Sequence, residues 1–437
     1  MTMSRPAVRL FATLGFLLPG GPLLAQSPAE RAIVQYVGAH NAEGIALLER
    51  IVNINSGTLN LAGVRAVGAV LRSELDALGF ITRWEDGAPY QRAGHLIAEH
   101  AGQGPRLLLI GHLDTVFDPD SPFQRFERID SAHARGPGTT DMKGGDVIIV
   151  QALKALKAQG ALDHMNITIV LHGDEEHAGE PQALARHTLI EAARKADIAI
   201  GFEDGDGDPT TAVIARRGYT GWLLTSTGTP AHSSQIFRED IGPGAIYESA
   251  RVLQTFRERL TGDPLLTFNP GVALGGTAVE LDSTAVKGTA AGKSNVVSAR
   301  MVVAGDLRTI SGERLAEAKA AMQAIVADHL PHTTSSIEFA DGYPPMAPTD
   351  GNRRLLAVLD QVSRDLGQGP VGIDNPARAG AADISFTAGL VPMSIDGLGL
   401  AGTGGHTDKE VADLRELLRL TSRAAILFYR LTRPARP

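Results

Sequence analysis

Strand-like apolar runs alternate with amphipathic helical segments in the first half of this chain, and this alternation restricts the fold more than any other feature. Chains with this order place helices on both faces of one sheet. We therefore predict an α/β domain with a central mixed sheet and helices on both faces. The strands are predicted at residues 82–86, 93–102, 105–117, 165–173 and 196–204, and the helices at 28–54, 65–80, 142–160 and 182–196.

The pattern changes near Ala212, where a smaller domain is predicted to begin. The order from there is β-α-β-β-α-β, which is the split unit of a ferredoxin-like α+β domain. A turn-rich segment at 344–352 then leads back to helices. The strands are predicted at 211–228, 269–281, 295–309 and 334–343 and the helices at 243–260 and 311–330, followed by helices at 353–367 and 414–433 and a short strand at 391–395.

Two domains also suit the length of 437 residues, since single domains usually contain ~100–200 residues. We predict that residues 214–343 are inserted into a larger domain, which is made of residues 26–213 and 344–437.

Residues 1–25 have the pattern of a cleavable export signal. Arg5 and Arg9 precede an apolar run that ends at Ala25. Prolines and glycines interrupt this run, which is too short for the alternative of a membrane anchor. No later segment has the length and apolarity of a membrane span. We expect cleavage near Ala25 and a soluble periplasmic or secreted product.

Composition excludes several kinds of site. The chain has no cysteine, which rules out disulfides, thiolate zinc sites and a cysteine nucleophile. Its formal net charge of −8 offers no basic surface for nucleic acid. The G-x-S-x-G motif of serine hydrolases and the glycine motifs of nucleotide sites are absent. Any bound metal must therefore be held by histidine, aspartate and glutamate.

Five short segments at the ends of apolar runs contain such residues. The carboxyl ends of the strands in an open α/β sheet meet at one edge, so these segments are expected to converge. Histidine and carboxylate ligands without thiolate suit one or two ions of zinc, cobalt or manganese. The segments contain His112 and Asp114, then Asp141, then Glu175 and Glu176, then Glu203 and Asp204, and finally His406 and Asp408.

The spacing of His112 and Asp114 places both side chains on the same face of the predicted strand. Residues i and i+2 of a strand point to the same face. Asp114 could therefore lie behind or beside His112, accept its second N–H and leave the other ring nitrogen for metal. Taken alone, the pair could equally form a hydrogen bond on the surface.

The adjacent glutamates Glu175 and Glu176 should have different roles, because neighbouring residues of an extended strand point to opposite faces. One could bind metal while the other acts as general base for a metal-bound water. An exposed acidic loop is the simpler alternative for this dipeptide alone, and only its combination with the other segments favours a metal centre. The flanking residues His172 and His177 are predicted to be bystanders, with His172 packing or hydrogen-bonding locally.

Together these segments resemble the co-catalytic two-zinc metallopeptidase and aminoacylase family, which includes glutamate carboxypeptidase, acetylornithine deacetylase and succinyl-diaminopimelate desuccinylase. The resemblance extends from about residue 30 to the C-terminus, with the motifs in the family's order. "RGPGTTDMKGG" and "GLGLAGTGGHTDKEVADL" are most similar to the secreted bacterial glutamate carboxypeptidase branch. The resemblance implies a zinc-exopeptidase-like fold in which the inserted domain is a lid and dimerisation domain.

The resemblance also implies a role for each candidate residue. Two zinc ions per subunit are expected, with Co²⁺ or Mn²⁺ as substitutes. His112 and Glu203 would bind the first ion, Glu176 and His406 the second, and Asp141 would bridge them, with Asp114 behind His112, Glu175 as general base and Asp204 as the alternative to Glu203.

Three residues of the inserted domain match family positions. His232, in "GTPAHSS", would reach the active site of a neighbouring subunit and stabilise the oxyanion, which implies a homodimer formed through the lid. Asn295 and Arg308 would contact the carboxylate side of the substrate, a task that suits the planar fork of arginine. The simpler alternatives are a surface His232 and an Arg308 paired with a lid carboxylate.

One departure from the family concerns the substrate pocket. The family often has a Gly-Thr-Asp-like turn where this chain has "AGAADISF", with Asp383 among alanines. This change affects the identity of the substrate more than metal binding.

The implied function is hydrolysis of an amide bond next to a free carboxylate, as in a glutamate carboxypeptidase. A metal-bridging hydroxide would be the nucleophile and Glu175 the general base, acting on small peptides or N-acyl amino acids. The alternatives are an N-acyl-amino-acid hydrolase, a dipeptidase, an aminopeptidase that requires a free N-terminus, and a catalytically silent periplasmic binding protein.

Overall fold

The computed structural model describes residues 26–282 and 287–433. The predicted export signal lies outside these residues, so the signal and the periplasmic or secreted location stay predictions. Among the described helices, none combines the length and the apolar character that a membrane crossing requires.

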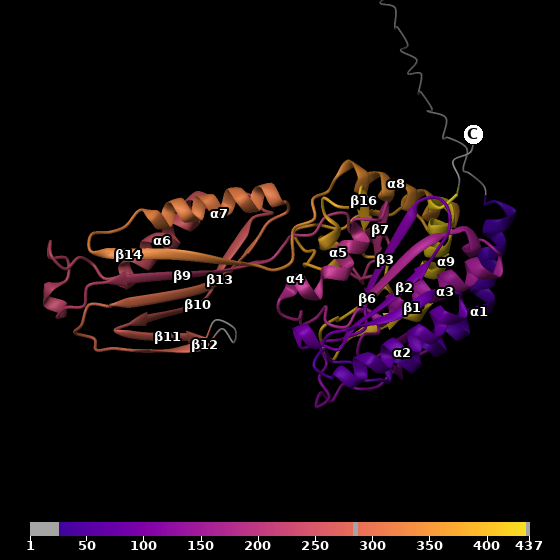
Figure 1. The fold of residues 1–437 in the computed structure, drawn as a ribbon, viewed down its shortest axis with the longest axis horizontal. Helices are drawn as coiled ribbons and strands as arrows, with labels where there is room; N and C mark the ends of the chain where they lie inside the picture. The colour runs from indigo at the N-terminus through magenta and orange to yellow at the C-terminus, as the bar shows by residue number, and fades with distance from the viewer. Residues whose placement is uncertain (1–25, 283–286, 434–437) are drawn as a thin grey trace, which may run out of the picture.

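The chain forms two bodies joined by two neighbouring segments (Figure 1). The larger body contains a six-stranded sheet in the order β1-β2-β6-β3-β7-β16. Strands β3, β6, β7 and β16 are parallel, whereas β1 and β2 pair antiparallel, which confirms the predicted mixed sheet. The strands are β1 (Ile81–Asp86), β2 (Gly94–His100), β3 (Arg106–His112), β6 (Asn166–His172), β7 (Ile198–Gly201) and β16 (Met393–Ile395).

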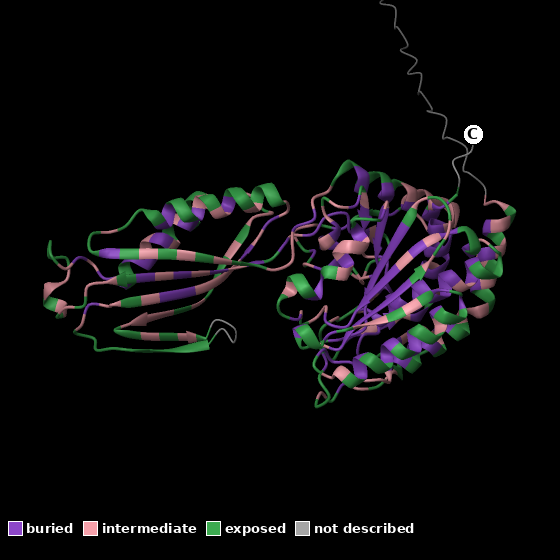
Figure 2. Cartoon of the chain, viewed as in Figure 1, coloured by how far each residue is buried: buried purple, intermediate pink, exposed green. Residues whose placement is uncertain are grey.

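Helices cover both faces of this sheet, as predicted, and Figure 2 shows the buried strands between them. Side chains of β3 alternate between two cores: Leu107 and Leu109 face one, Leu108 and Ile110 the other. The first core is completed by α1 (Pro28–Val52), α2 (Leu61–Ala77), α3 (Lys143–Ala158), α8 (Asp350–Asp365) and α9 (Leu414–Leu431), and the second by α5 (His187–Ala193) and the 3-10 helix Asp383–Thr387.

The smaller body, called the lid below, is a four-stranded antiparallel sheet in the order β10-β13-β9-β14 with two helices on one face. Trp222, Phe256 and Met322 lie in the core between sheet and helices. The order β-α-β-β-α-β is confirmed, with one exposed hairpin inserted that the sequence did not predict. The elements are β9 (Thr220–Gly228), α6 (Ala245–Leu260), β10 (Thr267–Gly276), the hairpin β11 (Ala278–Asp282) and β12 (Lys287–Ala291), β13 (Arg300–Arg308), α7 (Gly312–Ala327) and β14 (Thr333–Asp341).

Three predicted elements, two strands and one helix, are each divided into two in the structure. The strand at 269–281 divides into β10 and β11. The strand at 211–228 divides into β8 (Thr211–Ala212) and β9, because the chain crosses between the two bodies at 213–219. There it pairs with the returning segment instead of with a sheet: the backbones of Arg216 and Met346 exchange two hydrogen bonds of 2.9 Å. The returning segment leads to α8. The predicted limits of the inserted domain, residues 214 and 343, stay predictions.

The helix predicted at 182–196 breaks at Arg186 into α4 (Gln182–Ala185) and α5. The Arg186 side chain is fully buried and is bound by two carboxylates from other parts of the chain. Tertiary contacts therefore override a helical pattern of good local propensity. The remaining short strands are β4 (Glu127–Arg128), β5 (His133–Arg135), β15 (Gly372–Ile373), β17 (Gly402–Thr403) and β18 (Val411–Asp413).

Candidate metal centre

The candidate ligands meet at the carboxyl edge of the six-stranded sheet. Strands β3, β6 and β7 are parallel, so their ends lie at the same edge. His112 is the last residue of β3, and Glu203 lies shortly after β7. Glu175 and Glu176 lie shortly after the end of β6. The predicted convergence of these segments is confirmed.

Asp141 and His406 reach this edge from two loops. Asp141 precedes α3, whose first turn packs closely on the end of β7: a Cβ on Gly145 would lie 2.1 Å from the carbonyl oxygen of Phe202. Only glycine allows this approach. His406 lies between β17 and β18 and has a φ of 61°, a left-handed conformation that residues other than glycine seldom adopt.

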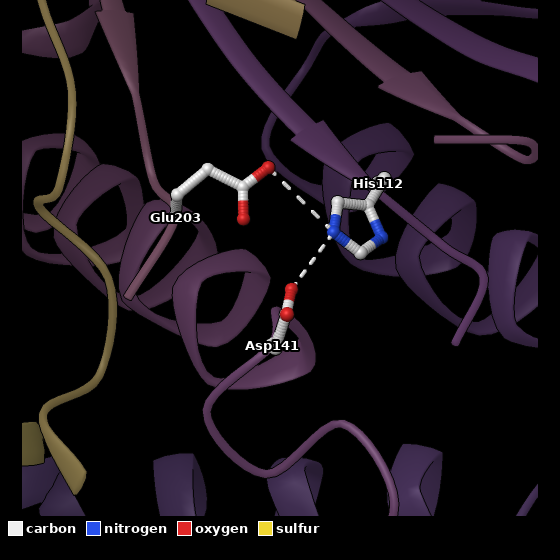
Figure 3. Close-up of side chains that lie close together, drawn as sticks. All are labelled: His112, Asp141 and Glu203. Atoms are coloured by element: carbon white, nitrogen blue, oxygen red, sulfur yellow. Dashed lines mark hydrogen bonds and ion pairs between the residues drawn. The ribbon is translucent and has the colours of Figure 1, made fainter. Parts of the chain in front are cut away.

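The first candidate metal-binding group contains His112, Asp141 and Glu203 (Figure 3). His112 Nε2 lies 3.1 Å from Asp141 Oδ1 and 3.6 Å from Glu203 Oε1. His112 is buried, and both carboxylates are nearly so. Asp204, the alternative to Glu203, does not belong to this group.

The second group contains Asp141, Glu176 and His406. His406 Nε2 lies 2.9 Å from Asp141 Oδ2 and 3.1 Å from Glu176 Oε2. The two oxygens of Asp141 thus face two different histidines, as a bridging ligand requires. In each group the ligand atoms lie within 4.8 Å of one another.

The donor set fits divalent cations. Burying several carboxylates together is unfavourable unless cations neutralise them. Glu176 Oε1 is buried and has no hydrogen-bond partner among the described residues. Imidazole and carboxylate donors without thiolate suit zinc and its first-row neighbours. The described residues therefore form a candidate site for two metal ions that share Asp141.

A protein-family model described as "Peptidase family M20/M25/M40" matches residues 108–428. The match covers most of the chain and includes every candidate ligand. The chain belongs to this peptidase family.

Relatives agree with this membership in the M20 family. Carboxypeptidase G2 from Pseudomonas sp. is 26% identical over 429 residues, which cover 97% of this chain and 98% of that protein. A protein named "Probable succinyl-diaminopimelate desuccinylase", from Staphylococcus aureus, is 32% identical over 181 residues, or 39% of this chain and 40% of that protein. The M20 protein described here is thus a metal-dependent hydrolase of peptide or related amide bonds.

Solved structures of low identity share the fold. An aminopeptidase from Bacillus cereus superposes with a TM-score of 0.69 at 18% identity, covering 90% of this chain and 99% of that chain. A dinuclear metal-binding peptidase of the M20 family from Bacillus subtilis has a TM-score of 0.63 at 14% identity, with coverages of 90% and 99%.

Without metal, protons take the place of the ions in this M20 site. Burial raises the pKa of Glu203 to about 7, with Asp141 also contributing. The pKa of His406 rises to about 11 because its ring is hydrogen-bonded to Asp141 and Glu176. Burial alone would lower the pKa of His112, but the Glu203 charge and bonds to Asp114 and Asp141 hold it well above its usual value.

We expect a chelator to lower Tm more at pH ~8 than at pH ~5. In the metal-free fold the pKa of Glu203 rises from 4.5 to about 7, and that of His406 from 6.5 to about 11. Protonation of each group therefore stabilises the metal-free fold fully below the lower pKa. This stabilisation is lost as the pH rises through the higher pKa. The pKa of Asp141 is lowered, so this residue stays ionised between pH ~5 and ~8 and its contribution to the stability of the fold is constant over that range. Metal binding must displace these protons, so it strengthens with pH. Thermal denaturation with and without chelator tests this, and a smaller chelator effect at the higher pH would contradict it.

Glu410 fixes the loop that carries the shared ligand. Its carboxylate accepts hydrogen bonds from the backbone N–H groups of Gly138, Thr140 and Asp141 at 2.9, 2.7 and 3.2 Å. Glu410 is fully buried and follows His406 in the same loop, so it ties the two metal-binding loops together. Glu410 was not predicted from the sequence. The glutamate in "GGHTDKE", within the motif that contains His406, is the only local signal.

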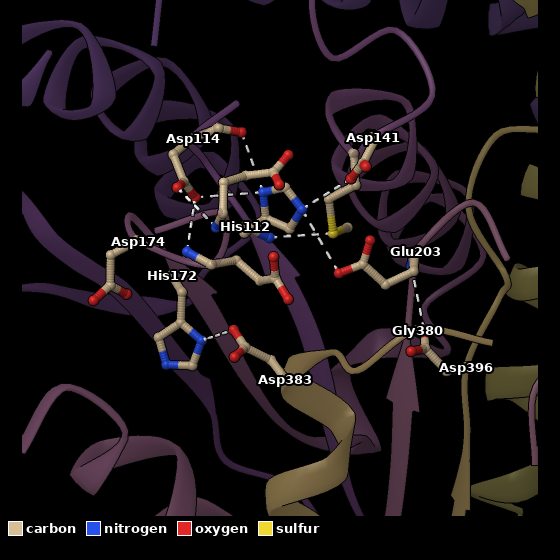
Figure 4. A network of polar contacts seen from close by, with 12 residues as sticks. His112, Asp114, Asp141, His172, Asp174, Glu203, Gly380, Asp383 and Asp396 are labelled. Carbon is tan, nitrogen blue, oxygen red and sulfur yellow. Dashed lines mark hydrogen bonds and ion pairs between the residues drawn. The ribbon is translucent and has the colours of Figure 1, made fainter. Parts of the chain in front are cut away.

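Asp114 has a broader role than the one predicted. His112 Nδ1 lies 3.1 Å from the backbone oxygen of Asp114 and 3.4 Å from its carboxylate. The carboxylate also accepts the backbone N–H groups of Glu175 and Glu176 at 3.0 and 3.2 Å. Asp114 therefore orients both the histidine and the glutamate pair (Figure 4).

Asp396 is a further anchor that the sequence analysis missed. Its carboxylate accepts the backbone N–H of Glu203 at 3.2 Å and forms an ion pair of 2.8 Å with Arg216. The pair is buried, so Arg216 neutralises Asp396, and Asp396 in turn holds the backbone of Glu203.

Asp383 and His172 belong to a buried network beside the metal centre (Figure 4). Asp383 pairs with Arg186 at 2.7 Å and with the Nδ1 atom of His172. His172 is a member of neither metal-binding group, and its ring packs against that of His95, 4.4 Å away, as the bystander role predicted. Its hydrogen-bond partner, Asp383, is remote in sequence. His177 is exposed, and its carbonyl accepts a hydrogen bond from Arg92.

The cavity at the metal centre has a volume of about 400 Å³. Glu175 lines it together with ligands of both groups. The segment "GAA" before Asp383 forms part of the wall, so the departure from the family pattern is at the cavity, as predicted. Small residues make up half of the residues that line the cavity, including this segment: Gly205, Gly207, Gly380, Ala381, Ala382, Gly402, Gly404 and Gly405.

The lid residues are not brought to this cavity within one chain. His232 and Asn295 are exposed and lie together, since the N–H of Ser233 donates to the Asn295 carbonyl at 2.8 Å. His232 follows the end of β9 that is remote from the larger body (Figure 1), and Asn295, between β12 and β13, lies beside it. The nine residues of β9 separate this end from the hinge by ~26 Å, at about 3.3 Å per residue.

Arg308 lies at the opposite end of the lid, next to the hinge, where its Nε bonds Asp306 at 2.9 Å and its guanidinium covers the ring of Tyr219. In a single chain, His232 and Arg308 thus have the simpler roles considered above, a surface histidine and an arginine paired with a lid carboxylate.

Proposed function

We propose that this M20 hydrolase is a carboxypeptidase, similar to glutamate carboxypeptidase, that cleaves an amide bond next to a free carboxylate. The observation that carries the proposal is the similarity to carboxypeptidase G2 over 97% of the chain. Arg308, which pairs with Asp306 in the single chain, is the proposed group for the substrate carboxylate, because it matches the family position and its planar fork suits that task. Two Zn²⁺ ions per subunit, replaceable by Co²⁺ or Mn²⁺, suit the donor set.

Glu175 is the proposed general base. It lines the cavity yet belongs to neither metal-binding group, and Asp114 holds its backbone N–H. When bound, the two ions would supply Lewis-acid activation of water and of the scissile carbonyl. Glu175 accepts the proton of the attacking water and delivers it to the leaving amine. Burial and the charges of Glu203 and Asp383 raise the pKa of Glu175 well above its usual value, which suits an acid that must return a proton.

A homodimer formed through the lid would complete the site. His232 and Asn295 would come from the neighbouring subunit, where His232 stabilises the oxyanion. An exposed apolar cluster near these residues supports a subunit contact there: Phe237 and Tyr247 are 64% and 52% exposed, and their rings are 5.5 Å apart. Apolar clusters of this kind mark interaction sites.

A second candidate is an N-acyl-amino-acid hydrolase. It is favoured by the match to the desuccinylase over 181 residues. A dipeptidase and a catalytically silent periplasmic binding protein are the remaining alternatives.

A substrate panel tests the proposal. The acyl group and the amino acid are varied independently, each substrate is also offered with its carboxylate amidated, and the metal content of the same preparation is measured. We expect hydrolysis of the free acids and a loss of at least ~10²-fold in kcat/KM on amidation, because the groups that bind the carboxylate would lose their charged partner. Cleavage that needs a free N-terminus instead would indicate an aminopeptidase, and a metal-loaded protein inactive on the whole panel would indicate a binding protein.

A further inference from the structure

Tyr343 connects the hinge of the lid to the backbone of Glu175. It lies on the segment that returns from β14 to α8, and its carbonyl accepts the N–H of Tyr219 from the outgoing segment at 2.9 Å. Its side chain bonds the larger body instead: the hydroxyl donates to the carbonyl oxygen of Glu175 at 3.1 Å. One residue thus bonds the hinge through its main chain and the Glu175 peptide through its side chain.

The Glu175–Glu176 dipeptide is held from two sides. Asp114 accepts both backbone N–H groups, and Tyr343 donates to the carbonyl group of Glu175. Glu176 is additionally fixed through its side chain by His406. The Glu175 side chain belongs to neither metal-binding group. Its position therefore depends on its own backbone, and the hydroxyl of Tyr343 is one of the groups that fix that backbone.

A buried arginine fixes the Tyr343 hydroxyl in turn. Arg186 donates to this oxygen at 2.8 Å, and it is itself held by Asp174 at 2.6 Å and Asp383 at 2.7 Å. Asp174 directly precedes Glu175. The arginine is fully buried. Its bonds to the two carboxylates are stronger than bonds between neutral groups, because both partners are charged. The tyrosine ring is also confined, 5.2 Å from that of Phe386.

We propose that Tyr343 is a positioning residue for the general base, which it holds through the Glu175 carbonyl and ties to the hinge of the lid. This inference rests on the proposed role of Glu175. Among the described residues, those that line the cavity do not include Tyr343. Its loss should therefore affect the chemical step more than substrate binding.

The test compares Tyr343→Phe with Tyr219→Phe in the full-length, metal-loaded enzyme. Phenylalanine keeps the ring contacts of Tyr343 and leaves Arg186 bonded to Asp174 and Asp383. We expect Tyr343→Phe to lower kcat by about 10-fold, because small displacements of a catalytic group are costly. KM should stay within about 2-fold, as expected for an interaction that acts on the chemical step. Metal content should be unchanged. Tyr219→Phe, on the other hinge segment, should match the parent enzyme in kcat.

Hydrogen exchange provides a readout independent of turnover. Amide exchange in the peptide that spans residues 173–180 should be faster in Tyr343→Phe than in the parent or Tyr219→Phe. Unchanged kcat, unchanged exchange, a rise in KM alone, or a kcat loss that follows a loss of metal would each overturn the inference.

The Glu175→Gln enzyme distinguishes a failure of the positioning inference from a failure of the proposed general base. If it is inactive while Tyr343→Phe is fully active, the positioning inference fails and the general base stands. If Glu175→Gln keeps the parental kcat, the proposed base and the inference that rests on it both fail.

Discussion

The Glu175→Gln enzyme is expected to keep its metal ions and to lose about 10³-fold in kcat, since a general base contributes ~10²–10⁴-fold. Glutamine has nearly the same shape and preserves the backbone bond to Asp114, but it cannot accept the proton of the attacking water. Because Glu175 is a member of neither metal-binding group, metal content measured on the same sample should equal that of the parent.

The neighbouring residue provides a matched control for this substitution. Glu176→Gln removes a carboxylate that lies 3.1 Å from His406 Nε2 and belongs to the second metal-binding group. It should therefore lose activity together with metal, and excess metal should restore part of it. If Glu175→Gln loses metal in the same way, Glu175 is a ligand and the assignment of the two glutamates is wrong.

The second large effect concerns His232, whose replacement by alanine is expected to lower kcat by ~10²–10³-fold, the usual range for one oxyanion donor. Within one chain, His232 is exposed at the end of the lid remote from the hinge. In the proposed homodimer, it would act on the cavity of the second subunit. The apparent molecular mass and kcat of the His232→Ala enzyme should therefore be measured together, and the mass should remain that of a dimer.

Complementation tests whether His232 acts between subunits. His232→Ala and Glu175→Gln chains, coexpressed with different tags, should form mixed dimers in which one of the two sites is complete. Random pairing would restore about a quarter of the parental activity. His177→Ala is the control, since His177 is exposed and should leave kcat within ~2-fold, as most surface substitutions do. A monomer with full kcat, identified by light scattering, would exclude the shared site.

The elements that follow from local pattern were predicted well. Helix α1 begins at Pro28 and is capped by Ser27, whose hydroxyl forms a reciprocal capping box with the Glu30 side chain. The alternation of strands and helices correctly gave the mixed sheet and the helices on both faces. The hairpin β11–β12 was not predicted as a unit, because β12 is exposed throughout and lacks the apolar alternation that identifies strands buried on one face.

The metal-binding groups were only partly foreseeable from the strand pattern. His112, Glu203 and the glutamate pair lie at or shortly after the ends of parallel strands, which meet at one edge. Asp141 and His406 reach that edge from loops, and only the family resemblance indicated them as ligands.

The groups that hold those ligands were not foreseeable. Glu410 bonds the backbone of a loop some 270 residues earlier, and Asp383 reaches His172 across 211 residues. No local spacing records such contacts, because they exist only after the chain has folded.

The sequence by itself thus determined the fold class, the order of the elements and the residue types available to a metal site, because periodicity and residue chemistry are local properties. The tertiary structure alone decided the distances between the candidate carboxylates and the histidines and which side chains fix the ligand loops. It also placed His232 and Arg308 at opposite ends of the lid. These outcomes depend on distances between segments that are remote in sequence, and only the packed fold sets those distances.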